Sequence, residues 1–388
     1  MTKQPVYLDN AATTPLAEEV LTAMLPYMKE TFGNPSSTYS VGRMSRLGVE
    51  TARKKVAQLL GVPPAGIYFT SGGTESNNTA IASAIRDLGC THIITSPIEH
   101  HAVLHTVEYY SRTNQIPFSL VALTPAGEVD YNDLERQLNQ LSLAGVKPLV
   151  SLMHANNEIG ALLDIARVGR LCKQYNAIFH SDCVQTVGHY PLNLLEYGVH
   201  FISGAGHKFH GPKGVGILYV HSELKIQPLI HGGGQERNLR AGTENVYGIV
   251  GFARALELAM EEYEQESKNI AHLKAYMKQE LVKAIPGVGF NSPDNSLYTV
   301  LSVCFPKSPN GESLLLELDM AGICVSGGSA CSSGDDSGSH VIKALNKNAD
   351  CNTIRFSFSK YNTIAEIDKV IMALQAILQV APAAIAIK

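Results

Sequence analysis

Residues 177–220 read AIFHSDCVQTVGHYPLNLLEYGVHFISGAGHKFHGPKGVGILYV, and their pattern predicts the fold. Short apolar runs recur in this stretch as AIFHSD, FISGAG and VGILYV, separated by polar or glycine-rich residues. Continuous apolar runs of this length are typical of strands that are buried on both faces of a sheet. The stretch therefore predicts neighbouring strands of an α/β sheet.

The same pattern extends toward the N-terminus through the runs PLVSLMH, FSLVAL, THIITS and GIYFT. Helix-forming segments lie among them, including residues 41–60, 77–87 and 165–175. This alternation predicts a mainly parallel, seven-stranded sheet. Ligands of such sheets bind beyond the carboxyl ends of the strands, so we expect the functional residues in the segments that follow these runs.

A second domain is indicated by residues 246–284, which form a long, charged, helix-forming stretch without a strand. Beyond it, YTVLSVCF and TIRFSFS read as strands and residues 364–378 as a final helix. We expect a large domain over residues 15–260 and a smaller α+β domain over residues 1–14 and 261–388. A mobile loop is expected over the Gly/Ser-rich residues 326–339.

The composition is that of an ordinary globular protein. The chain has 388 residues, 45% of them hydrophobic, and a net charge of -4, which argues against nucleic acid or an anionic membrane as the main partner. Neither a signal peptide nor a membrane-spanning run is apparent. The seven cysteines are scattered, without CxxC or metal-site spacing, so we expect no disulfide framework, no metal site and a reducing cytoplasm.

The segment TSGGTESNN, residues 70–78, lies between a predicted strand and a predicted helix. Gly73 permits a tight turn, and Thr74 with the first helical amides would present donors to an anion that the helix dipole also favours. An ordinary glycine turn with Thr74 or Ser76 as a helix cap fits the same residues. No GK[ST] follows, so the segment is not a Walker loop.

Two further segments place a carboxylate ahead of a lysine. Asp182, in HSDCVQTVG, follows a buried strand, where it would either hold a pyridinium nitrogen protonated or cap a helix. Lys208, in SGAGHKFHGPKGVG, lies among small residues, which favours loss of its proton and reaction with an aldehyde. The alternative for Lys208 is a solvated surface charge, and we interpret Lys213 as that case.

Three more segments are candidates by composition. SPIEHHAVLH, residues 96–105, offers three histidines, of which we expect one to move protons and two to pack. VSGGSACSSGDDSGS, residues 325–339, isolates Cys331 as either a mobile nucleophile or a free thiol in a linker. HGGGQERNLRAGTEN, residues 231–245, fits either a basic surface turn or a phosphate-binding segment.

Ten segments occur together in one order: YLDNAATTP, FGNPSS, FTSGGTESNN, EHHAVL, MHANNEIG, HSDCVQTVG, GHKFHGPKG, HGGGQERNLRAGTEN, SGGSACSSG and IRFSFS. Through them the chain resembles the long-loop, NifS- and IscS-like cysteine desulfurases of the class V aminotransferase family over nearly its whole length. The resemblance implies the aspartate aminotransferase-like fold of transferases that depend on pyridoxal 5'-phosphate (PLP). It also implies conversion of L-cysteine to L-alanine, with transfer of the sulfur to an enzyme cysteine as a persulfide.

The resemblance assigns roles to particular residues. Lys208 would bind the cofactor covalently, His100 would stack on it and move protons, and Cys331 would receive the sulfur. Asn34 and Arg355 would bind the substrate. Contacts to the cofactor are implied for Gly73, Thr74, Asn156, Asp182, Gln185, Ser203, His207 and Thr243, the last from the other subunit of a homodimer. We further expect a cytoplasmic enzyme that passes sulfur to an iron–sulfur scaffold or to tRNA-thiolation enzymes, without binding nucleic acid or membrane directly.

Two residues depart from the family pattern. Ala205 stands where a hydroxyl residue is common, which removes one contact to the phosphate. Cys183 stands beside Asp182 where a small residue is common, and we expect it to be buried packing. Selenocysteine lyase and class V aminotransferase activity are the alternative functions, and a catalytically silent binding protein is a third.

Overall fold

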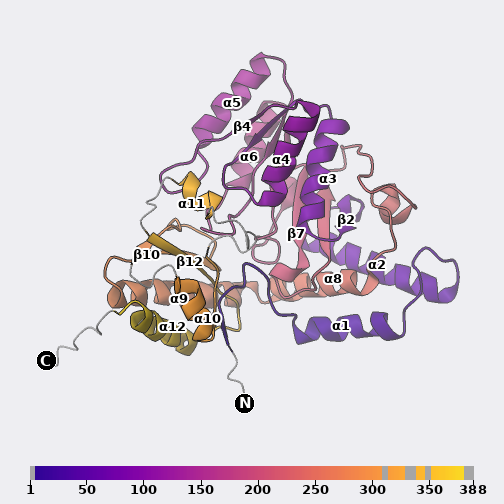
Figure 1. The fold of residues 1–388 in the computed structure, drawn as a ribbon. Helices are drawn as coiled ribbons and strands as arrows, with labels where there is room; N and C mark the ends of the chain where they lie inside the picture. Colours follow the sequence, from indigo (N-terminus) through magenta and orange to yellow (C-terminus); the bar gives the residue numbers. More distant parts are fainter. Residues whose placement is uncertain (1–4, 308–312, 328–337, 346–350, 380–388) are drawn as a thin grey trace.

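The computed structural model describes residues 5–307, 313–327, 338–345 and 351–379 (Figure 1). A seven-stranded sheet has the order β2-β8-β7-β6-β5-β3-β4. β8 runs antiparallel to both of its neighbours, and the other strands share one direction, which confirms the predicted mainly parallel sheet. The strands are β2 (Ile67–Thr70), β3 (His92–Thr95), β4 (Phe118–Leu120), β5 (Pro148–Ser151), β6 (Ile178–Asp182), β7 (Phe201–Ala205) and β8 (Gly216–Val220).

Successive residues of the central strands face opposite sides of the sheet, and each side packs against its own helices. Ile93 and Leu149 pack with α3 and α4, whereas Ile94 and Val150 belong to the core on the other face. The central strands are mainly apolar because both of their faces are covered. The edge strand β4 is the exception, since its Phe118 side chain is 37% exposed; the expectation of a buried strand is wrong there. Helices of this part are α1 (Glu18–Lys29), α2 (Ser40–Leu59), α3 (Gly73–Arg86), α4 (His101–Asn114), α5 (Tyr131–Leu143), α6 (Ile165–Gln174), α7 (Leu194–Tyr197) and α8 (Val246–Glu261).

A separate hydrophobic core underlies the smaller α+β domain. Its three-stranded sheet has the order β12-β10-β9, and a parallel pair joins β1 near the N-terminus to β11. The linking stretch predicted from the sequence forms two helices, α8 and α9, that meet at Glu262. The elements are β1 (Val6–Tyr7), α9 (Tyr263–Ala284), β9 (Gly289–Phe290), β10 (Val300–Pro306), α10 (Leu314–Met320), β11 (Ile323–Cys324), α11 (His340–Ala344), β12 (Cys351–Ser357) and α12 (Ile364–Ile377). The domain boundaries given above stay a prediction.

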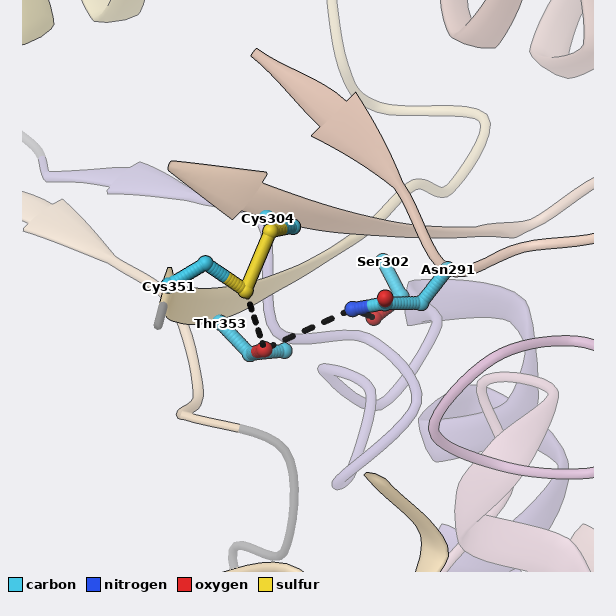
Figure 2. The surroundings of a disulfide bond; sticks show 5 residues. All are labelled: Asn291, Ser302, Cys304, Cys351 and Thr353. Carbon is cyan, nitrogen blue, oxygen red and sulfur yellow. Dashed lines mark hydrogen bonds between the residues drawn. A yellow bond between two sulfur atoms is a disulfide. The ribbon is translucent and has the colours of Figure 1, made fainter. Parts of the chain in front are cut away.

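One disulfide is present although the sequence indicated no disulfide framework. Cys304 on β10 is bonded to Cys351 on β12, with the two Cα atoms 5.4 Å apart (Figure 2). The cysteines are 47 residues apart in sequence, so their spacing carried no signal, and only the antiparallel pairing of β10 with β12 brings them together. Within the described ranges, no helix is long and apolar enough to cross a membrane.

A buried ion pair ties α2 to the sheet and to the short 3-10 helix η3 (Gln235–Asn238). Two nitrogens of Arg53 donate to the two oxygens of the Glu236 carboxylate, each over 2.8 Å, and both side chains are 2% exposed. Glu236 also accepts a hydrogen bond from the backbone N–H of Phe69. Glu236 has φ 44°, in the left-handed region that non-glycine residues rarely occupy. The ion pair with Arg53 therefore stabilises a backbone conformation that is otherwise unfavourable.

Replacing Arg53 with Met should lower the free energy of unfolding by about 3–5 kcal/mol, because Glu236 would remain buried without its charged partner. Chemical denaturation followed by circular dichroism measures this loss. Glu50→Gln is the matched control, since it removes the partly exposed partner of the same guanidinium and should cost less than about 1 kcal/mol. Equal losses in both variants would contradict the role assigned to the buried pair.

Candidate active site

A cavity of about 380 Å³ opens where the carboxyl ends of the parallel strands meet. The segments after β2, β3, β5, β6 and β7 all contribute to its lining. Strands with a shared direction end at the same edge of a sheet, so residues far apart in sequence converge there. Of the residues assigned from the sequence, the lining contains Gly73, Thr74, His100, Asp182, Gln185, His207, Lys208 and Arg355.

One end of the cavity is suited to an anion. Gly73 opens α3 and Thr74 follows it, so the N-terminus of this 14-residue helix points its free amides into the lining. A Cβ on Gly73 would lie 2.5 Å from Cγ2 of Val184, so glycine is required for the close approach. His207 contributes a ring whose Nδ1 lies 3.2 Å from Oγ1 of Thr13. Burial lowers the pKa of His207 to about 4, so the ring is neutral at physiological pH.

A buried carboxylate also lines the cavity. Asp182 ends β6, and Oδ2 accepts a hydrogen bond of 2.6 Å from Nδ2 of Asn77 on α3. Its Oδ1 accepts from the backbone N–H of Val184 over 2.9 Å, which fixes the plane of the carboxylate. Gln185 lies beside it, with its amide nitrogen bonded to the carbonyl oxygen of Ala11. The alternative interpretation of Asp182 as a plain helix cap therefore does not account for its place in the lining.

Lys208 ends the short 3-10 helix η2 (Gly206–Lys208) that follows β7. Its Nζ donates to the carbonyl oxygens of Ala11 and Ala12 over 2.6 and 2.8 Å. The amine is thus held by neutral groups of the N-terminal segment, in contrast to Lys213, which is exposed as expected. A lysine in such surroundings is suited to covalent bonding with a carbonyl carbon.

His100 is one of two histidines of the EHHAVLH segment that line the cavity. It caps α4, and its Nδ1 accepts a hydrogen bond of 3.0 Å from the backbone N–H of Ala102. Burial lowers the pKa of His100, with Asp182 opposing that shift and Lys208 adding to it. The neutral ring therefore carries its proton on Nε2. His101 also lines the cavity, and His105 stacks on His101 with ring centroids 4.7 Å apart.

Arg355 on β12 is the buried cation of the cavity. Its side chain is 2% exposed, and Nη2 donates to Oδ1 of Asp9 over 2.7 Å. Nη1 donates to the carbonyl oxygen of Asn157 over 3.0 Å. Nε is buried and has no hydrogen-bond partner among the described residues. A guanidinium with an unsatisfied donor is suited to a carboxylate ligand.

The lining also contains residues that sequence reasoning missed. Asn157 and Glu158 come from the quoted segment MHANNEIG, and His340 begins α11. Oε2 of Glu158 accepts a hydrogen bond of 2.5 Å from Ser339, and burial raises the pKa of Glu158. The two adjacent asparagines, Asn156 and Asn157, were the signal in the sequence for a polar residue at this place. Only the turn after β5 shows that Asn157 is the one that lines the cavity.

Four assigned residues lie outside the lining. Asn156 is fully buried and bonds to the backbone of Ile98, Glu158 and Ile159, whereas Ser203 is bonded to His180. Asn34 and Thr243 are exposed. Cys331 lies outside the described residues. Ala205 does line the cavity, and Cys183 is fully buried with its pKa raised to about 12, as expected for packing.

The basic segment 231–245 makes structural contacts through both of its arginines. Arg240 forms an ion pair of 2.9 Å with Glu75, and Arg237 lies over the ring of Tyr68. Neither arginine lines the cavity. Among the described residues, no group of three or more histidine, cysteine, aspartate or glutamate side chains could hold a metal ion.

The donor set of the cavity fits PLP. The amides at the start of α3, with Thr74 and His207, would hold its phosphate, and Asp182 would pair with its pyridine nitrogen. Lys208 offers the amine for its aldehyde carbon. The main support for PLP is the fixed orientation of the Asp182 carboxylate, which Asn77 and Val184 hold by hydrogen bonds. A buried carboxylate that lines a cavity is stabilised by a cationic partner, and a protonated pyridine nitrogen is such a partner.

Comparison with known proteins identifies the family of the chain. The aminotransferase class-V family model matches residues 6–370. The cysteine desulfurase IscS of Dictyoglomus turgidum is 45% identical, over 97% of this chain and 95% of its own length. A solved NifS-like protein is 39% identical with a TM-score of 0.89, covering 97% of this chain and 100% of that one. A solved structure of SspA in complex with cysteine is 30% identical with a TM-score of 0.79, covering 92% of this chain and 100% of that one.

These matches extend over nearly the whole chain, and the family model spans all three sheets. Their family depends on PLP, the cofactor for which the cavity is suited. The chain therefore belongs to the aminotransferase class-V family, among relatives that are PLP-dependent cysteine desulfurases.

Proposed function

We propose that the protein converts L-cysteine to L-alanine and transfers the sulfur to Cys331 as a persulfide. The observation that carries the proposal is Arg355, a buried cation with an unsatisfied Nε, in the same cavity as Lys208 and Asp182. The guanidinium would bind the carboxylate of the amino acid and so place its Cα near the amine of Lys208. The bound cysteine of SspA, a relative of the same fold, supports this choice of substrate.

The chain's own residues supply the binding and proton-transfer steps. PLP, when bound, acts as an electron sink for the substrate carbon. Asp182, held by Asn77, would pair with the pyridine nitrogen and favour its protonated form, and the amine of Lys208 would take the proton from Cα of cysteine. His100 is neutral with its proton on Nε2, so it can donate that proton within the cavity and later regain it.

Sulfur transfer follows as a displacement at the substrate sulfur. The Cys331 thiolate forms a bond with that sulfur, the bond between the sulfur and Cβ breaks, and its electron pair stays with the carbon. The Cβ carbon then takes up a proton, Cα regains the proton held by Lys208, and the product is alanine. Cys331 retains the transferred sulfur as a persulfide, which an acceptor protein for iron–sulfur assembly or tRNA thiolation would receive.

A homodimer is part of the proposal. Large apolar side chains are exposed along residues 28–47, among them Phe32 at 76%. A soluble monomer rarely exposes so many apolar residues in one stretch, so a second copy is the natural partner. Thr243 is exposed and outside the cavity of its own chain, which agrees with a role in the cavity of the other copy.

A cytoplasmic location is also proposed. Cys90, Cys172, Cys183 and Cys324 are free thiols. Free thiols persist where the compartment is reducing.

Lys208→Ala should abolish the borohydride-reducible bond between enzyme and cofactor, because no other lysine lines the described cavity. Absorbance and mass spectrometry after borohydride treatment measure the covalent adduct. Lys213→Ala, at an exposed lysine of the same segment, is the matched control and should retain the adduct. Covalent fixation in Lys208→Ala would show that another residue holds the cofactor.

Arg355→Ala should weaken the binding of cysteine by more than about tenfold, because loss of a buried charged hydrogen bond costs on the order of 2–5 kcal/mol. Titration of the cofactor absorbance with cysteine measures the affinity. Arg355→Lys keeps the charge but loses the planar guanidinium, so an intermediate affinity is expected. An unchanged titration in Arg355→Ala would rule out the carboxylate contact.

Cys331→Ala should bind cofactor and cysteine normally but form no persulfide, since those binding steps do not use the thiol. Mass spectrometry of the wild type after brief exposure to cysteine should locate one added sulfur in the peptide that contains Cys331. Cys324→Ala, at a free half-buried thiol, is the control and should behave as the wild type. Alanine production from cysteine by Cys331→Ala at the wild-type rate would favour the alternatives, a selenocysteine lyase or an aminotransferase.

A further inference from the structure

Glu158 is a titratable residue of the cavity to which the proposed function gives no role. Its side chain lines the cavity, yet the residue is only 2% exposed. Glu158 follows Asn157, whose carbonyl oxygen accepts a hydrogen bond of 3.0 Å from Nη1 of Arg355. The Glu158 carboxyl therefore lies near the guanidinium to which we assign the carboxylate of the amino acid.

A hydrogen bond from Ser339 distinguishes the two carboxyl oxygens of Glu158. Ser339 precedes α11, and its hydroxyl oxygen accepts from the backbone N–H of Ile342 over 3.2 Å. The one hydroxyl proton is donated to Oε2 of Glu158 over 2.5 Å. Oε2 is therefore an acceptor. A proton bound by Glu158 is then carried on Oε1, the oxygen to which no described residue donates.

Glu158 forms no ion pair with any residue in the described part of the chain. Two charged or titratable side chains act on its carboxyl, Arg355 from β12 and His340 from α11. Both side chains form their hydrogen bonds elsewhere. Nη2 of Arg355 donates to Asp9, whereas His340 directs Nε2 to the backbone carbonyl oxygen of Glu99. The Glu158 carboxyl is thus buried without a cation bonded to it.

This environment favours the protonated form of Glu158. A buried carboxylate loses its hydration, and here no ion pair replaces the lost water. Burial raises the pKa of Glu158, and the smaller effects of Ser339, His340 and Arg355 oppose that rise. Glu158 therefore retains its proton at a higher pH than an exposed glutamate does.

The charges around Arg355 determine how a further carboxylate can bind. The guanidinium is already paired with Asp9, so the two side chains together have no net charge. An amino-acid carboxylate adds one negative charge, and ionised Glu158 would add another. Three carboxylates would then share one buried guanidinium, which the repulsion of like charges disfavours. A protonated Glu158 removes one of these charges and supplies a hydrogen-bond donor.

We propose that Glu158 is a second substrate-binding residue, which donates the proton on its Oε1 to the carboxylate that Arg355 holds. The inference rests on the proposed function, which places the carboxylate of the amino acid at Arg355. Wherever Glu158 is ionised in the ligand-free enzyme, binding of the substrate is coupled to the uptake of one proton by this carboxyl.

The coupling determines the direction of the pH dependence. Below the pKa of Glu158 in the ligand-free enzyme, the donor is in place, and the affinity does not change with pH through this group. As the pH rises through that pKa, the carboxyl ionises, and each bound carboxylate requires a proton from solution. The apparent Kd then rises by up to about tenfold for each pH unit.

The test uses the holoenzyme and 3-(methylthio)propionate. This compound has the carboxylate and a thioether sulfur but lacks the amine that reacts with the cofactor, and its carboxylate stays ionised above about pH 6. Isothermal titration calorimetry in two buffers of different ionisation enthalpy measures the Kd and the number of protons taken up. The wild type should bind at least about tenfold more weakly at pH 9 than at pH 6 and should take up about one proton at the higher pH.

Variants separate ionisation from hydrogen bonding. Glu158→Gln keeps an acceptor for Ser339 and a donor for the ligand but cannot ionise. Its affinity should equal that of the wild type at pH 6, change less than about threefold up to pH 9, and involve no proton uptake at Glu158. Glu158→Leu lacks the donor and should bind at least about fivefold more weakly at pH 6. Glu128→Gln, at a half-buried glutamate outside the lining, is the matched control and should keep the pH dependence of the wild type.

The outcomes distinguish this inference from the function on which it rests. Cofactor absorbance shows that each variant has folded, and alanine formation from cysteine by the wild type tests the proposed function separately. Equal pH dependence in the wild type and Glu158→Gln would overturn the role of Glu158 alone. So would a wild-type affinity that does not change with pH, or undiminished binding at pH 6 by Glu158→Leu. A wild type that forms no alanine, yet binds the analogue with a pH dependence that Glu158→Gln removes, would overturn the proposed function and leave the carboxylate site.

Discussion

The common direction of six strands in the large sheet is the constraint on which the active site depends. All of these strands except the edge strand β4 are covered on both faces, so the side chains that can reach a ligand lie at or beyond the strand ends. The carboxyl ends meet at one edge, which brings Thr74, His100, Asp182 and Lys208 into one cavity although they are distant in sequence. The chemistry of the site is thus a consequence of how apolar strands must be packed.

The smaller domain contributes the cation that completes the cavity. Arg355 reaches it because β12 pairs with β10 over a separate core, and because Asp9 and the carbonyl oxygen of Asn157 hold the guanidinium in place. Three separate parts of the chain therefore meet at one side chain. The buried position has an energetic cost that the ion pair with Asp9 offsets, and Nε has no hydrogen-bond partner among the described residues.

Much of this protein was already determined by its sequence, because local patterns report local structure. Apolar runs predicted all seven strands of the large sheet, and the glycine turn, Asp182 and Lys208 were recognisable from the strands that they follow, whereas only the family resemblance selected His100 among three histidines. Only the tertiary structure decided that Asn157 rather than Asn156 faces the cavity, that Ser203 is bonded inside the sheet, and that Cys304 meets Cys351. Which way a side chain points in a turn, and which strands pair across 47 residues, depend on packing between distant segments. Such packing cannot be predicted from the local spacing of residues in the sequence.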